Sequence, residues 1–123
     1  MYSTNETFKS NFRMLNKFYE IKNPSEVELF IEKHENLFKL LDETKSHLKE
    51  AFPYGKFELE MSPDLSGEGN DTLLVNIFVD NETFNNGFTD RILEIDMKIL
   101  PLQKELDLTM QLCLMEGIPP LDN

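Results

Sequence analysis

Oxygen-bearing side chains between residues 64 and 70 have the spacing of a calcium-binding loop. Asp64, Ser66, Glu68 and Asn70 stand at alternate positions, and glycine occupies the sixth, where such loops turn sharply. The twelfth position, which supplies a bidentate glutamate in an EF-hand, is Val75. Helices flank an EF-hand loop, whereas the patterns on both sides of this segment predict strands. We therefore interpret the segment as a turn-rich loop and expect no bound metal or cofactor.

The two histidines and the single cysteine do not indicate a metal or nucleophilic site. His34 and His47 are thirteen residues apart, about 220° around a continuous helix, so they cannot share a metal there. We interpret both as helix-surface residues. Cys113 is predicted on the outer face of a strand in acidic surroundings, which raise a thiol pKa and disfavour a nucleophilic role.

Carboxylates that follow the second predicted strand give the alternative, enzymatic hypothesis. Asp64 together with Asp96 and Lys98 superficially resembles a metal-dependent nuclease site, where acids hold Mg²⁺ and a lysine assists the water. In such sites the second acid and the lysine lie on a strand, but here they fall in a helical pattern. We expect the acids of residues 80–96 on the solvent face and at the start of that helix. A small metal-dependent hydrolase or transferase is the alternative function.

The net charge of −11 comes entirely from the second half of the chain. Residues 1–56 contain nine basic and nine acidic residues, whereas residues 57–123 contain three basic and fourteen acidic ones. A surface of that sign repels nucleic acid and anionic lipid and attracts a basic protein. The same charge also serves solubility without any partner. We therefore expect no direct binding to nucleic acid or membranes.

The leading hypothesis is a non-enzymatic protein–protein interaction module whose acidic half binds a basic partner, as an inhibitor or antitoxin does. Candidate partner-binding residues are the acids predicted on outer strand faces and after the second strand: Glu58, Glu60, Asp107, Asp80 and Glu82. If the strands carrying Glu58, Glu60 and Asp107 are neighbours, their carboxylates share a surface without a compensating cation nearby. A cationic partner surface would then neutralise them.

A hairpin over residues 56–80 organises the predicted fold. Residues 57–61 alternate apolar and acidic side chains, and residues 73–79 are β-branched and apolar. Helical spacing precedes this hairpin over residues 3–21 and 25–52, with a short break at 34–36. It follows the hairpin from Phe84 to a stop at Pro101, and Gly87 weakens its first turns, so the ordered part is expected to begin near Phe88. Residues 106–114 alternate again and predict a third strand.

These elements predict a single α+β domain over residues 1–123, in the order α-α-β-β-α-β. Helices are expected on one face of a small three-stranded, mainly antiparallel sheet. A split connection gives the strand order 2-1-3, which we prefer slightly. The order 1-2-3 is the alternative, because residues 73–79 are apolar on both faces, as a central strand is.

Several packing patterns resemble a family of small uncharacterised bacterial α+β proteins. The resemblance covers about residues 24–115 and rests on residues 26–31, Leu37, residues 40–41, the stop at Phe52-Pro53, the strand at 57–60, the apolar second strand and the final run at 112–114. It implies this fold class and no known activity.

Length and composition set the expected context of the protein. A chain of 123 residues can bury a core without disulfides, and its one cysteine forms no internal bridge. No leader pattern or long apolar run is present, so we expect a cytoplasmic protein. The aromatic stripe of Phe8, Phe12, Leu15 and Tyr19 packs either on its own domain or on another chain. We expect a homodimer formed through that stripe or through a sheet edge.

Overall fold

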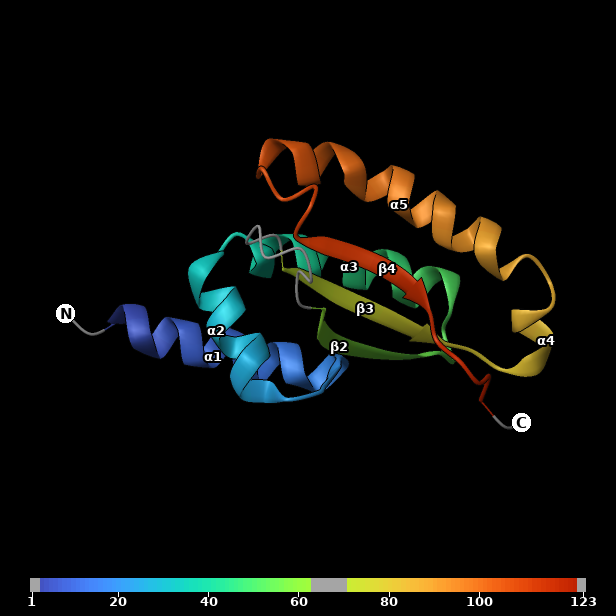
Figure 1. Ribbon diagram of the computed structural model, residues 1–123, viewed down its shortest axis with the longest axis horizontal. Coiled ribbons are helices and arrows are strands. Elements are labelled where there is room, and N and C mark those ends of the chain that lie inside the picture. The colour runs from blue at the N-terminus through green and yellow to red at the C-terminus, as the bar shows by residue number, and fades with distance from the viewer. Residues whose placement is uncertain (1–2, 63–70, 122–123) are drawn as a thin grey trace.

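A computed structural model describes residues 3–62 and 71–121 of the chain. Figure 1 shows how its helices and strands are arranged. Their bounds are α1 Ser3–Phe18, β1 Glu20–Ile21, α2 Pro24–Lys33, α3 Leu37–Ala51, β2 Lys56–Ser62, β3 Thr72–Phe78, α4 Asn81–Phe84, α5 Phe88–Glu105 and β4 Leu112–Glu116. The α+β class is confirmed, as is the break between α2 and α3.

The sheet contains four strands among the described residues, in the order β1-β2-β3-β4. Only β2 and β3 are antiparallel, whereas β1 pairs with β2 and β4 with β3 in parallel. The prediction of three mainly antiparallel strands in the order 2-1-3 is therefore wrong. The three predicted strands correspond to β2, β3 and β4, and they lie in the alternative order 1-2-3. The apolar character of β3 reflects its central position, since it has a hydrogen-bonded neighbour on each side.

The core lies between the sheet and the helices. Leu59, Val75 and Leu114 stand opposite one another on adjacent strands and are almost completely buried. In Figure 1, α3 passes behind the strands and α5 runs along the β4 side. Among the described residues, no helix crosses β3 and β4 on the viewer's side of that figure, so this second face of the sheet has no covering helix there.

The aromatic stripe of α1 is part of this core. Phe8 and Leu15 are each 8% exposed and Tyr19 is 1% exposed, with Phe12 packed beside them. Phe8 contacts Phe38 of α3 edge to face at 5.3 Å between ring centroids. Of the two alternatives for this stripe, packing on its own domain is the one observed, so a homodimer through the stripe is not supported. A dimer through a sheet edge stays a prediction.

The C-terminal third differs most from the prediction. Helix α5 begins at Phe88, as expected, but continues through Pro101 to Glu105. Pro101 and the Met97 residue four positions earlier are both exposed, so water can bond to the carbonyl that proline leaves without a donor. The last strand begins only at Leu112, not at residue 106.

Turn bonds explain why residues 106–111 are not a strand. Leu108 donates its backbone N–H to Gln103 at 2.8 Å, and Asp107 has a positive φ of 58°. Leu108 is buried, but Met110 is 64% exposed, so the alternation of apolar residues does not correspond to one buried strand face. The turn that satisfies the last carbonyl groups of α5 takes up these residues, so they do not form a strand despite their alternating pattern.

Candidate functional site

The open face is the set of strand side chains that point away from the helices. Its central row runs from Glu20 through Glu58 and Asn76 to Met115, which stand opposite one another on β1, β2, β3 and β4. Glu60, Leu74 and Cys113 form the adjacent row, and Lys56 and Phe78 form the row on the other side. This face therefore combines carboxylates on β1 and β2 with apolar side chains on β3 and β4.

Glu58 and Glu60 are held in place by two neighbours. The Asn76 side-chain amide donates to Oε1 of each carboxylate at 3.0 Å. Lys22 Nζ lies 3.8 Å from Glu58 and 4.0 Å from Glu60. The expectation that these acids lack a nearby cation is therefore wrong. The cause is the two-residue strand β1, which was predicted as the end of a helix. Because β1 pairs with β2, Lys22 lies beside β2.

A hollow of about 200 Å³ lies next to the carboxylates, at the end of the sheet where Lys56 pairs with Phe78. Phe78 and Leu121 supply its apolar wall, and Glu20 and Glu58 supply carboxylates. Lys56 and Phe57 complete the lining. Such a hollow accepts a long side chain with an apolar stem, and its carboxylates favour a cationic end.

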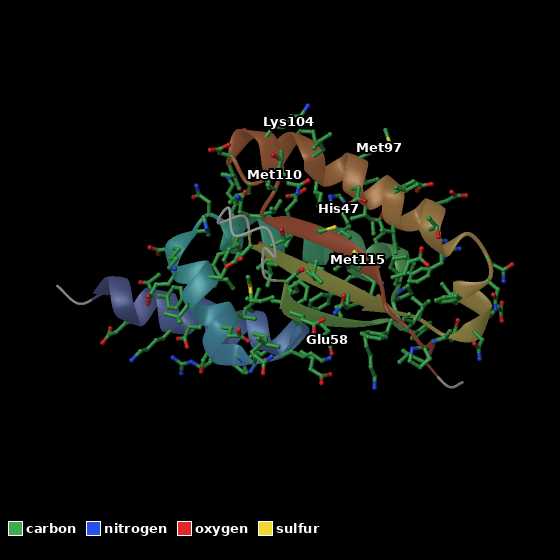
Figure 2. The ribbon with its side chains drawn as sticks, in the orientation of Figure 1. His47, Glu58, Met97, Lys104, Met110 and Met115 are labelled. Carbon is green, nitrogen blue, oxygen red and sulfur yellow. The ribbon has the colours of Figure 1, made fainter. Side chains whose placement is uncertain are left out.

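Exposed apolar side chains also lie at Met115 on β4 and along one side of α5. Met115 is 43% exposed, and Leu93, Met97 and Leu100 of α5 are 53%, 74% and 39% exposed. Figure 2 shows Met115 over the strands and Met97 projecting outward from α5. The spacing of the three α5 residues places them on one side of that helix.

Cys113 lies on the open face, as predicted for an outer strand position. Partial burial raises the pKa of its thiol, and the nearby Asp96 carboxylate adds to that increase. Burial also raises the pKa of Asp96 itself. A raised thiol pKa lowers the fraction of nucleophilic thiolate, and the inert role of Cys113 stays a prediction.

The five predicted partner-binding acids do not form one surface. Asp80 precedes α5 and caps α4, where its Oδ1 accepts from the Thr83 backbone N–H at 2.7 Å. This bond from the Thr83 backbone, and a second one from the Thr83 side chain, lower the pKa of Asp80. Glu82 lies exposed on α4, and Asp107 follows α5 in a turn.

The length of α5 separates these acids. Its 18 residues span about 27 Å, so Asp107 is remote from Asp80 and Glu82. Asp107 instead lines a hollow with Lys33 and His34. The predicted common surface for Asp107, Glu58 and Glu60 is wrong, because residues 106–111 form a turn. Only Glu58 and Glu60 of the five belong to the open face.

Sequence reasoning missed Glu20, Lys22 and Asn76. The first two belong to a two-residue strand and its continuation, which no sequence periodicity can indicate. Asn76 could have been identified from the sequence, because it is the one side-chain amide within the apolar strand β3. A buried or half-buried amide in such a place requires a hydrogen-bonding partner on a neighbouring strand.

No group of three or more metal-ligating side chains occurs within residues 3–62 and 71–121. The calcium-like segment, residues 64–70, lies outside the described residues. His34 packs against Phe30 at 4.8 Å between ring centroids, and His47 Nε2 lies 3.2 Å from Glu43 Oε2. Asp96 and Lys98 both lie on α5, as predicted.

Comparisons with protein-family models, with curated proteins and with solved structures found no match. The resemblance to a small α+β family thus stays a prediction. In the described part of the chain, no helix has both the length and the hydrophobicity of a membrane span.

Proposed function

We propose that the protein is a non-enzymatic interaction module that binds a basic protein partner through its open face. The observation that supports this proposal is the juxtaposition, on a sheet face without a covering helix, of Glu20, Glu58 and Glu60 with Leu74, Phe78 and Met115. Interfaces typically combine an apolar centre with a polar rim that selects the partner.

The hollow at Phe78 explains how a basic partner is recognised. The stem of an arginine or lysine packs on Phe78 and Leu121, and its charged end reaches the carboxylates of Glu20 and Glu58. Asn76 and Lys22 hold Glu58 and Glu60 in one geometry before binding, which reduces the entropy lost on association.

Charge also determines the kinetics of this association. The net charge of −11 attracts a basic partner over a distance of about 8 Å at physiological salt. A nucleic-acid-binding protein or a toxin with a basic active surface fits this chemistry, because occupation of that surface would block it. The alternative of a metal-dependent hydrolase gains no supporting cluster of ligands in the described residues.

The test uses the double variant Glu58→Gln and Glu60→Gln. Glutamine keeps the oxygen that accepts from Asn76 but removes the charge. The probe is a peptide of about twelve residues in which arginine and leucine alternate, and binding is measured by fluorescence anisotropy at about 50 mM and 300 mM salt. We expect the double variant to weaken binding about tenfold or more at low salt, and by much less at high salt.

The matched control is the double variant Glu26→Gln and Glu32→Gln, which changes the net charge equally on exposed positions of α2. It is expected to bind the peptide nearly as the unmodified protein does. Amide shifts on peptide addition should map to β2, β3 and β4. If both double variants lose peptide affinity equally, or if the amide shifts are confined to other elements, the open face is not the binding surface.

A further inference from the structure

A second hollow shares Glu20, Lys56 and Phe57 with the first but is lined by more lysines than carboxylates. It has a volume of about 430 Å³ and lies where the ends of α1 and α3 meet the start of β2. Phe18, Phe52, Pro53 and Phe57 line it together with Gly55. A Cβ at Gly55 would lie 3.1–3.2 Å from Phe57, Phe52 and the Phe78 carbonyl, so a larger residue would crowd this turn. We call this hollow the lysine cleft.

Three lysines from three different elements line the lysine cleft. Lys17 comes from α1, Lys49 from α3 and Lys56 from β2, and Glu20 is the acid that accompanies them in the lining. Within residues 3–62 and 71–121, no carboxylate lies within 4.0 Å of any of these three ammonium groups. Residues 1–56 are neutral by composition, yet the fold gathers cations at this point.

We propose that the lysine cleft binds a small phosphorylated molecule whose organic part packs on the Phe18 and Phe57 rings. Its volume is within the range of small-molecule sites, about 300–1,000 Å³. Lysine binds phosphate as a point charge, whereas planar recognition of carboxylates favours arginine, which is absent from this lining. The rings of Phe18 and Phe57 stack on each other at 5.0 Å between centroids, and both residues line the hollow.

The charge of the rest of the protein selects a small anion over a polymer. A phosphate group inside the cleft would be lined by the three lysines, so their local field would dominate over that of more distant charges. An extended nucleic acid would also meet the acidic remainder of a chain with net charge −11 and be repelled. This site adjoins the hollow of the open face, because Glu20, Lys56 and Phe57 line both, but it requires no protein partner.

The probes are 2-naphthyl phosphate, inorganic phosphate and 2-naphthol, each titrated into the full-length protein and followed by amide chemical shifts. We expect 2-naphthyl phosphate to shift residues of the α1, α3 and β2 ends and to bind at least tenfold tighter than either part alone. Inorganic phosphate should compete for the same residues. Absence of saturable shifts at about 10 mM naphthyl phosphate, a weak affinity by any standard, would overturn the proposal.

Two sets of lysine variants separate a binding role from a structural one. Lys17 and Lys49 lie in the last turns of α1 and α3, where they also complement the helix dipoles. Lys56 lies on a strand, so Lys56→Gln removes a cation without affecting a helix end. We expect Lys56→Gln to weaken naphthyl phosphate binding at least fivefold.

The matched control is the double variant Lys9→Gln and Lys98→Gln, two exposed lysines outside the lining. The double variant Lys17→Gln and Lys49→Gln should reduce binding more than tenfold, with the fold checked by circular dichroism. The control should keep the affinity within about twofold. If the control loses as much affinity as the cleft variants, or if Lys56→Gln loses none, binding reflects general charge and the proposal is wrong.

Discussion

The buried hydroxyl of Tyr19 gives the sharpest prediction of stability and its pH dependence. Tyr19 is 1% exposed, and its hydroxyl donates to the Leu41 carbonyl at 2.9 Å. Replacement by phenylalanine keeps the ring packing but removes this donor. We expect Tyr19→Phe to lower the free energy of unfolding by about 1 kcal/mol near pH 7. For 123 residues this corresponds to about 4 °C in melting temperature.

At alkaline pH the order of stability is expected to reverse. Burial, together with the Asp42 charge, raises the pKa of Tyr19 in the folded protein far above its ordinary value of 10.0. A group with a raised folded pKa contributes its full stability below the unfolded pKa and loses it as pH rises toward the folded one. The unfolded chain thus releases a proton above about pH 10 that the folded chain retains. At about pH 11 this costs the unmodified protein about 1.4 kcal/mol, which Tyr19→Phe does not lose.

Denaturant unfolding at pH 7 and at pH 11 measures both effects. Tyr54→Phe is the matched control, because Tyr54 is 92% exposed and should change stability by less than about 0.5 kcal/mol at either pH. The reasoning fails if Tyr19→Phe remains less stable than the unmodified protein by the same amount at both pH values. Such a result would mean that Tyr19 ionises equally easily in the folded and unfolded chains.

Three further predictions concern packing and the thiol. Leu59→Ala should lower the free energy of unfolding by about 2–5 kcal/mol, measured by urea unfolding, because Leu59 is completely buried at the centre of β2. Gly117→Ala should cost about 1–3 kcal/mol, since a Cβ there would lie 2.6–2.7 Å from the Phe78 ring; in a Phe78→Ala background most of this cost should disappear in a double-mutant cycle. Cys113 should react with iodoacetamide near pH 8 more slowly than cysteine in a short peptide, and Asp96→Asn should accelerate it, as followed by mass spectrometry; an unchanged rate would contradict the influence of Asp96.

The sequence pattern predicted the candidate sites only in part. Alternation placed Glu58 and Glu60 on the face opposite Phe57 and Leu59, and the burial of those two apolar residues agrees with it. No pattern indicated that Lys22 would pair with both acids, because the contact depends on a two-residue strand that forms only against β2. The lysine cleft is equally invisible in the sequence, since its lysines are distributed over forty residues.

What the sequence determined by itself are the features set by neighbours within a few residues. These are the α+β class, the hairpin, the start of α5 at Phe88 and the core faces of the hairpin strands, because side-chain periodicity and local capping fix them. Only the tertiary structure decided the strand order, the parallel pairing of β4 and the end of α5. The strand order and the pairing of β4 depend on contacts between distant segments, and the end of α5 depends on solvent access to a particular carbonyl. The spacing of nearby residues determines neither these contacts nor that access.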